Sequence, residues 1–364
     1  MRFGGSRNMQ AKVLFLGLLA VFVTSYFLIH LEWEIARLDK AREKLEVAMA
    51  QLQLGDVDQD HLRAPRSQTG VRDTFAQVDE DNLVMIYNRV PKTGSTSFAG
   101  VAYELCVRNK FHVLHLNVTK NSHVLSVPDQ VRFVNNVTSW QTMKPALYHG
   151  HLAFLDFTKF GLIQKPLYIN IIRNPLDRLI SYYYFLRNGD DFRPHLKRRR
   201  MGNKMTFDEC VEEGGSDCDP INLWLQIPFF CGHAAECWEP GSEWALTQAK
   251  YNLLNNYLLV GTTEELSNFV AVLEATVPRL FAGARYLFET GEKSHLRKTY
   301  NKLTPSSETV RKIHQSEIWR MENEFYEFAS RQFQFVMKRT FDLNANGELE
   351  AKKQQFTYEK IRPR

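Results

Sequence analysis

The chain has 364 residues, enough for one large domain or two smaller ones. With 44% hydrophobic residues its composition is ordinary for a globular protein, and it can bury a sizeable core. The formal net charge of +5 at pH 7 is too small to identify a nucleic-acid-binding protein, and we expect no nucleic-acid partner.

An uncharged, apolar segment lies near the N-terminus at residues 13–29. Its 17 residues are at the lower limit for a membrane-spanning helix. Basic residues precede it and acidic residues follow it, which places the N-terminal side in the cytosol. A cleaved signal peptide is the alternative, but no small-residue cleavage site follows. We expect a cytoplasmic tail at residues 1–12, an uncleaved signal anchor at 13–29 and a lumenal body.

A stalk is predicted at residues 30–54. Leucines recur there every seven residues, at Leu31, Leu38, Leu45 and Leu52. This heptad spacing favours a short coiled coil and self-association, without giving the number of subunits. A single amphipathic helix that acts as a spacer is the alternative. Residues 55–80 are polar and aperiodic, so we expect a linker there, before a domain at 81–364.

Cysteines and asparagines agree with a lumenal body. Four of the five cysteines form two close pairs, Cys210 with Cys218 and Cys231 with Cys237. Such neighbours typically form disulfides in an oxidising compartment; a zinc site is the alternative, although the spacings differ from C-x2-C. Cys106 lies among apolar residues, which predicts a buried thiol. Asn117 and Asn136 each begin a glycosylation acceptor triplet.

The body alternates short apolar runs with helical segments. Strands are predicted at 83–87, 166–172 and 257–261, and helices at 98–107, at 176–186 and from 262, the last with capping residues at its start. This alternation indicates an α/β fold with a mainly parallel central sheet flanked by helices. Ligands of such sheets bind at the carboxyl ends of the strands.

The first predicted strand ends in the loop Arg89-Val-Pro-Lys-Thr-Gly-Ser-Thr-Ser97. A phosphate group needs backbone N–H donors, hydroxyl donors and a cation at a helix N-terminus. Gly94 allows close approach of the backbone, and Lys92 supplies the cation. The order differs from the Walker motif, in which Lys follows Gly. An ordinary Ser/Thr helix cap is the alternative, but so many suitable groups favour a phosphate-binding loop.

The second loop follows the strand at 166–172. Arg173 leaves the end of that strand and can bind a second phosphate, and Ser181 adds a hydroxyl about two helical turns further on. The alternative is an ordinary strand-to-helix turn with a surface ion pair between Asp177 and Arg178. Together with the first loop, this motif predicts a ligand with two phosphate groups.

A third motif is Tyr148-His149-Gly150-His151. A neutral imidazole near pH 7 suits the removal of a proton from an attacking hydroxyl. On an extended segment, His149 and His151 would send their rings to the same side. Two metal ligands, a structural pair and a surface accident are the alternatives.

Two basic clusters indicate a polyanionic substrate. They contain Lys197, Arg198, Arg199, Arg200 and Lys204 in one run and Lys293, Arg297, Lys298 and Lys302 in another. A sulfated, carboxylated polysaccharide attracts such groups by steering and counterion release. Solvated loops are the alternative.

Several segments resemble the Golgi sulfotransferases that use 3′-phosphoadenosine 5′-phosphosulfate (PAPS) and sulfate the 2-hydroxyl of uronic acids. They are residues 87–98, 148–151, 181–187, 223–233 and 293–299. The resemblance covers the body from about residue 82 to Lys360 and extends to the anchor and stalk. It implies transfer of a sulfo group from PAPS to uronic acid, chiefly iduronic acid, in heparan sulfate. It also implies a P-loop-like phosphosulfate loop, no metal, a single-pass type II protein of the Golgi membrane, and a homotrimer.

The resemblance gives individual residues a role. The nucleotide-binding positions are Lys92, Thr93, Gly94, Ser95 and Thr96 at the 5′ side, Arg173 and Ser181 at the 3′-phosphate, and Ser294, Thr299 and Lys302 in a late segment that closes over the nucleotide. The acceptor-binding positions are Arg89, Tyr103, His115, Lys120, Arg198 and Arg297. His151 is the preferred general base, His149 is its support or alternative, and Lys92 neutralises charge on the leaving phosphate.

Three other functions compete with this hypothesis. The nearest is a uronyl 2-O-sulfotransferase that acts on dermatan or chondroitin sulfate. An ATP-dependent kinase with an atypical P-loop would need a Walker lysine that the sequence lacks. A heparan-binding lectin on a membrane stalk would account for the basic clusters, but not for two phosphate loops beside a histidine pair.

Overall fold

The computed structural model describes residues 80–119, 122–162, 165–191, 193–291, 299–344, 349–353 and 355–356. The predicted tail, anchor and stalk, and the linker up to residue 79, lie outside these residues, so they stay predictions. Within the described ranges, no helix is both long and apolar enough to span a bilayer.

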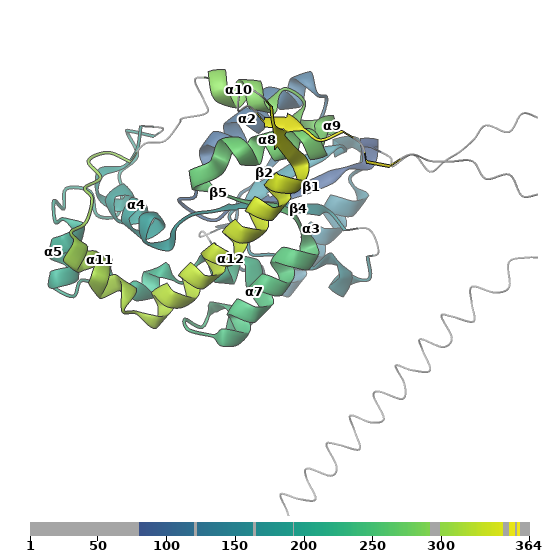
Figure 1. The fold of residues 1–364 in the computed structure, drawn as a ribbon. Coiled ribbons are helices and arrows are strands. Elements are labelled where there is room, and N and C mark those ends of the chain that lie inside the picture. Colours follow the sequence, from purple (N-terminus) through teal and green to yellow (C-terminus); the bar gives the residue numbers. More distant parts are fainter. Residues whose placement is uncertain are drawn as a thin grey trace, which may run out of the picture. The chain divides into compact units, whose positions relative to one another are not determined.

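A five-stranded sheet forms the centre of the described domain (Figure 1). Its strands are β1 (Val84–Asn88), β2 (His112–Leu116), β3 (Ala146–Gly150), β4 (Leu167–Ile172) and β5 (Tyr257–Thr262). They lie in the order β2-β3-β1-β4-β5, and all four pairings are parallel. The α/β prediction and its three predicted strands are therefore confirmed. A separate antiparallel pair joins β6 (Phe341–Leu343) to β7 (Leu349–Ala351).

Helices cover the sheet and extend beyond it. They are α2 (Ser95–Arg108), α3 (Val127–Ser139), α4 (Pro175–Asn188), α5 (Phe207–Glu212), α6 (Gln226–Cys231), α7 (Glu243–Asn256), α8 (Leu266–Thr276), α9 (Pro278–Phe281), α10 (Ala284–Thr290), α11 (Ser307–His314) and α12 (Glu317–Thr340). Short 3-10 turns are η1 (Glu80–Asn82), η3 (Gln141–Met143), η4 (Phe157–Phe160), η5 (Pro220–Leu223), η6 (Ala235–Trp238) and η7 (Thr263–Glu265).

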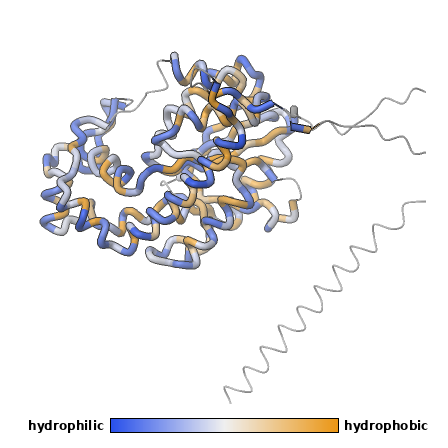
Figure 2. The backbone as a smooth tube through the Cα atoms, viewed as in Figure 1, coloured by the Kyte–Doolittle hydropathy of each residue, from blue (hydrophilic) through white to orange (hydrophobic). Residues whose placement is uncertain are grey.

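The two faces of the sheet bury separate hydrophobic clusters, because side chains alternate along a strand. Met85 belongs to a cluster with residues of α2, α8, α9 and α10, whereas its neighbour Ile86 belongs to a cluster with residues of α6 and α7. The hydrophobic colour is concentrated on these central strands (Figure 2). Helix α12 crosses the molecule diagonally (Figure 1) and contributes Phe325 to one cluster and Phe333 to the other. It therefore joins the two halves of the core.

The predicted helix after β5 exists, but its expected caps are not used as caps. Neither Thr262 nor Glu265 makes a side-chain capping bond. Instead, Thr263 Oγ1 donates to the Ile172 carbonyl at 3.0 Å, and Glu264 accepts the Asn174 N–H at 3.2 Å. These side chains bind backbone groups at the end of β4 and not the first turn of their own helix. They therefore join the ends of β4 and β5.

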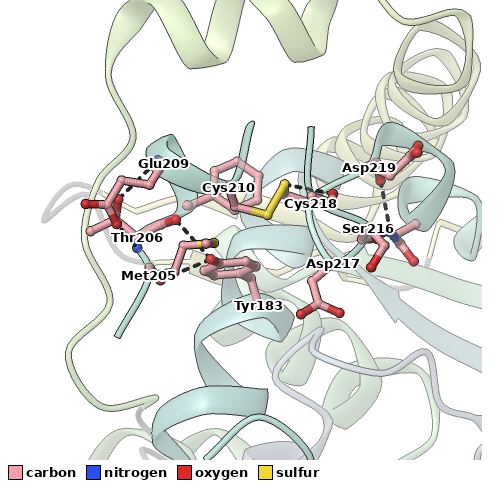
Figure 3. The surroundings of a disulfide bond; sticks show 12 residues. Tyr183, Met205, Thr206, Glu209, Cys210, Ser216, Asp217, Cys218 and Asp219 are labelled. Atoms are coloured by element: carbon pink, nitrogen blue, oxygen red, sulfur yellow. Dashed lines mark hydrogen bonds between the residues drawn. A yellow bond between two sulfur atoms is a disulfide. The ribbon is translucent and has the colours of Figure 1, made fainter. Parts of the chain in front are cut away.

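Both predicted disulfides are present, Cys210–Cys218 and Cys231–Cys237, so the zinc alternative is wrong. Figure 3 shows the first bridge beside Tyr183, whose hydroxyl donates to the carbonyls of Met205 and Thr206 at 3.0 and 2.9 Å. This bridge belongs to a third hydrophobic cluster, formed mainly by α4, α5 and α11.

The thiol of Cys106 was predicted to be buried, and it is less buried than expected. Its thiol is free and only half-buried, and it donates to the Tyr103 carbonyl at 3.1 Å. Helix α2 carries its buried residues on one side, at Phe98, Ala102 and Leu105, and Cys106 lies at the margin of that side.

Candidate active site

The sheet topology brings the predicted loops to one edge. Strand β1 connects toward β2 on one side of the sheet, whereas its neighbour β4 connects to β5 on the other side. Such a switch in direction opens a crevice at the carboxyl ends of the two strands, where α/β proteins bind ligands. The loop of residues 89–97 follows β1 and Arg173 follows β4, so both phosphate motifs border this crevice.

The phosphate loop has the backbone that its sequence predicts. Gly94 is the N-cap of α2 at φ 75°, with no side-chain capping bond, so the Ser/Thr cap alternative is wrong. A Cβ atom at Gly94 would lie 3.3 Å from Cγ2 of Thr263, which leaves little room for a side chain. Lys92 also has a positive φ, of 70°. Thr93 is buried, and its hydroxyl donates to the Val90 carbonyl at 3.0 Å, which stabilises the turn of the loop.

The ring of Phe185 on α4 brings together residues that are far apart in the sequence. The Lys92 ammonium lies 4.2 Å from the ring centroid, and the Arg198 guanidinium lies 4.3 Å from it. Lys92 Nζ also donates to Thr299 Oγ1 at 3.2 Å. Two predicted site residues therefore meet at an aromatic ring that was not predicted to be part of the site, and Lys92 links them to a third, Thr299. Its position four residues after Ser181, on the same helix face, was the available signal.

Arg173 lies beside the phosphate loop, as predicted. One guanidinium nitrogen donates to the Lys92 carbonyl at 3.4 Å. Its Nε is buried and has no hydrogen-bond partner among the described residues. Burial and the charge of Arg173 both lower the pKa of Lys302, whose ammonium lies 3.7 Å from Asp177. Arg173 and Lys302 repel one another, and Arg173 Nε is a buried hydrogen-bond donor. A bound anion would stabilise both features.

The described part of the segment that was predicted to cover the nucleotide contacts the end of α4 at Thr299 and Tyr300. Asp190 and Thr299 form an isolated antiparallel bridge, and the side chain of Asn188 donates to the Tyr300 carbonyl at 2.9 Å. Ser294 and Arg297, like Lys120, lie outside the described residues. Ser181 is buried on α4.

The second loop is not an ordinary turn with a surface ion pair. Arg178 is only 2% exposed and donates to the carbonyls of Asn222 and Leu223 at 2.8 and 3.0 Å. Asp177 faces Lys302 instead. The alternative reading of this loop is therefore wrong.

A cluster of rings surrounds His149 at the end of β3. His149 is only 3% exposed, stacks on His115 at 5.0 Å between centroids, and has its Nε2 2.8 Å from the Tyr103 hydroxyl. Burial lowers the pKa of His149 to about 3, with further lowering by Arg89, His115 and His151. His149 therefore stays neutral across physiological pH.

His151 has a defined tautomer. Its Nδ1 lies 2.8 Å from the Arg89 carbonyl, which can only accept, so Nδ1 carries the proton. The other nitrogen, Nε2, then presents a lone pair, and it lies 3.4 Å from a guanidinium nitrogen of Arg89. The predicted acceptor residues Arg89, Tyr103 and His115 therefore gather around the histidine pair.

The first basic run folds onto a carboxylate. Arg199 and Arg200 bind Asp217 at 3.4 and 2.8 Å, and the buried Arg187 binds it at 3.1 Å. Burial alone would raise the pKa of Asp217, but hydrogen bonds from Arg200 and Arg187 outweigh it and lower that pKa. Arg198 instead lies 3.5 Å from Asp190 and contacts Phe185. The run is therefore an organised loop that turns Arg198 toward Lys92.

Three other predictions concern ligands that the structure does not contain. Asn117 and Asn136 are both exposed, so their glycosylation stays a prediction. Across the described ranges, no group of three or more His, Cys, Asp or Glu side chains is placed to hold a metal ion.

Comparison with known proteins agrees with this geometry. The profile of the sulfotransferase family matches residues 76–329. Heparan sulfate 2-O-sulfotransferase 1 of Gallus gallus is 58% identical over 349 residues, which cover 96% of each chain. The Homo sapiens protein of the same name is 56% identical over the same length and coverage. The heparin sulfate O-sulfotransferase of Drosophila melanogaster is 53% identical over 352 residues, covering 97% of this chain and 95% of the fly protein.

Proposed function

Because this chain belongs to the sulfotransferase family, we propose that it transfers a sulfo group to the 2-hydroxyl of uronic acid, chiefly iduronic acid, in heparan sulfate. The observation that carries this proposal is the meeting of the phosphate loop, Arg173 and the histidine pair at one edge of the sheet. The names of the relatives support the choice of heparan sulfate. Membership of this family excludes the kinase and the lectin as the primary function.

PAPS is the donor that the family implies, and when bound it supplies the activated sulfo group and a leaving phosphate. The residues fit a nucleotide with two phosphate groups. Lys92 to Thr96 would hold the 5′ side, where Gly94 admits close approach of the backbone. Arg173, with its buried and unpartnered Nε, and Ser181 would hold the 3′-phosphate. Thr299 and Lys302, with Ser294, would cover the nucleotide.

Two properties make His151 the better general base. Its proton on Nδ1 is held by the Arg89 carbonyl, so the lone pair is on Nε2, and the sugar hydroxyl would give its proton to Nε2 in place of the 3.4 Å contact with the Arg89 guanidinium. His149, with a pKa of about 3, is too weak a base for efficient proton transfer near neutral pH. His149 instead holds Tyr103 through Nε2 and supports the acceptor side.

Lys92 neutralises negative charge that grows on the leaving phosphate. Its ammonium is held by Thr299 Oγ1 and by the ring of Phe185. A cation fixed before the reaction stabilises developing charge without the cost of reorganisation.

The acceptor chain would lie along the basic and aromatic groups beside the histidines. These are Arg89, Tyr103, His115 and Arg198, with Lys120 and Arg297 as further proposed contacts. We also propose that the protein is a homotrimer in the Golgi membrane, with a type II anchor at residues 13–29 and the enzyme domain in the lumen.

An acceptor panel tests the proposal. The protein is incubated with labelled PAPS and with desulfated heparan, dermatan or chondroitin chains, and the products are digested to disaccharides. We expect label on the 2-hydroxyl of iduronic acid in heparan. Efficient labelling of dermatan instead would identify a uronyl 2-O-sulfotransferase, and a lack of labelling in all three would overturn the proposal.

A further inference from the structure

The side chain of Gln226 binds the backbone of Arg173 through two hydrogen bonds. The Arg173 N–H donates to Gln226 Oε1 at 2.9 Å, and Gln226 Nε2 donates to the Arg173 carbonyl at 2.9 Å. Gln226 is fully buried, at 0% exposure, on the first turn of α6. It lies 53 residues from Arg173 in the sequence.

These two hydrogen bonds take the place of the bonds that a neighbouring strand would make to Arg173. The parallel ladder between β4 and β5 ends at Ile172 and Thr262, so Arg173 lies just beyond the sheet. A buried backbone group without a partner costs free energy, and it leaves the residue free to move. The Gln226 amide supplies one donor and one acceptor, as a neighbouring strand would. The main chain of Arg173 is therefore fixed at the point where its side chain enters the crevice.

Glu322 on α12 orients the Gln226 amide. Its Oε1 accepts the N–H groups of Leu225 and Ile227 at 2.9 and 3.0 Å, and its Oε2 accepts from Gln226 Nε2 at 3.4 Å. A flipped amide would place oxygen against the Glu322 carboxylate and against the Arg173 carbonyl. Glu322 therefore selects the orientation that holds Arg173. It is fully buried, at 0% exposure, and its charge also faces the buried Arg178.

We propose that Gln226, oriented by Glu322, is a positioning residue for binding of the nucleotide 3′-phosphate. This inference rests on the proposed function, in which Arg173 binds that phosphate. Gln226 does not touch the nucleotide; it acts through the backbone of Arg173. Loss of its two bonds lets the guanidinium move away from the phosphate, so the affinity contributed by the 3′-phosphate falls.

The test compares two nucleotides that differ only in that phosphate. Calorimetry gives the affinity of the protein for 3′-phosphoadenosine 5′-phosphate and for adenosine 5′-phosphate, and the ratio reports the 3′-phosphate alone. We expect Gln226→Met, which keeps the length but not the hydrogen bonds, to lower this ratio about tenfold, while the affinity for adenosine 5′-phosphate changes little. Gln248→Met is the matched control, because Gln248 binds Asn252 on the same helix and no other side chain in the described part of the chain, and its ratio should equal that of the wild type.

A second variant guards against misfolding of the first. Glu322→Gln keeps an oxygen for the N–H groups of Leu225 and Ile227 but turns a donor toward Gln226, so the amide orientation is lost, together with the charge that faces Arg178. It should lower the same ratio, and thermal unfolding shows whether the variant keeps its fold. An unchanged ratio in folded Gln226→Met or Glu322→Gln, or an equal loss for both nucleotides, overturns the inference. A wild-type protein that binds both nucleotides equally overturns the assignment of Arg173 itself, which is a distinguishable result.

Discussion

At the scale of single residues, the two histidines of the site contact different groups. The Arg89 carbonyl holds the Nδ1 proton of His151, whereas burial, and to a smaller extent the charge of Arg89, keeps His149 neutral. Two imidazoles in one short motif therefore have different surroundings, which is why we propose different roles for them. The sequence motif alone left the choice between them open, because the two rings are chemically the same until their neighbours are known.

Removal of the proposed base should affect the chemical step and leave the fold intact. His151→Ala is expected to lower kcat by about 10²–10⁴-fold, which is the usual contribution of a general base. Single-turnover transfer with labelled PAPS measures this effect. Thermal unfolding and nucleotide binding serve as controls, and both should stay close to the wild type. Near-normal turnover would remove His151 from its role.

The pH dependence of kcat tests the role of His149. Since its pKa is lowered to about 3, His149 gains a proton only in strong acid and stays neutral from pH 5 to 8. An acid limb of kcat in that range must therefore belong to another group, and it should keep its midpoint in His149→Gln. We would measure kcat at saturating PAPS and acceptor from pH 5 to 8. Disappearance of the limb in this variant would identify His149 as the base instead.

At the scale of elements, the loop after α4 is organised by one carboxylate next to the Cys210–Cys218 bridge (Figure 3). Asp217 is labelled there beside Cys218, and its side chain is 9% exposed. It holds Arg187, Arg199 and Arg200, so the loop that carries Arg198 keeps one shape. The disulfide closes the short segment that carries Asp217, which fixes the carboxylate in front of its arginines.

Asp217→Asn should therefore weaken both the fold and acceptor binding. Breaking a buried ion pair leaves Arg187 without its counter-charge, and we expect the free energy of unfolding to fall by about 2–3 kcal/mol. The KM for heparan should rise more than the KM for PAPS if Arg198 binds the acceptor, as we propose. Denaturant titration and steady-state kinetics measure the two effects.

Asp129→Asn is the control for this prediction. Asp129 pairs with Arg132 at an exposed surface, where such a pair stabilises by at most about 1 kcal/mol. A similar loss of stability in both variants would contradict the proposed importance of Asp217.

At the scale of the whole molecule, Glu322 makes stability depend on pH. Burial raises the pKa of Glu322 from 4.5 to about 6, although Arg178 and three hydrogen bonds oppose this shift. The folded chain therefore holds this proton more tightly than the unfolded chain. The resulting stabilisation is full below about pH 4.5 and is lost as the pH rises through about 6.

We expect this loss to be about 2 kcal/mol between pH 4.5 and 7. Denaturant titrations of the wild type and Glu322→Gln at several pH values isolate it, because contributions of other groups cancel in the difference. The stability of the wild type relative to the variant should decrease over this range. A constant difference would show that Glu322 titrates normally.

Much of the fold could be predicted because the central strands are apolar and end in loops with recognisable chemistry. Strands β1, β4 and β5 and both phosphate loops were found in this way. Strands β2 and β3 were missed. Strand β2 is a half-exposed edge strand in which His112 and His115 interrupt the apolar residues, and β3 ends in the histidine motif at His149 and Gly150.

The support of the site could not be predicted from local pattern. Phe185 is an ordinary aromatic residue until the packing of α4 brings it beside Lys92. Gln226 and Glu322 are 96 residues apart, and nothing in the sequence around either residue predicts the hydrogen bond between them. Such contacts arise only when the chain has folded.

Helix α12 has a consequence for the biogenesis of the protein. It supplies Phe325 and Phe333 to the two cores and Glu322 to the hydrogen bond with Gln226, yet it follows both phosphate loops in the sequence. A nascent chain that extends only as far as residue 316 lacks all three contributions. We therefore expect the nucleotide site, although its loops are made earlier, to become competent only after α12 has been synthesised.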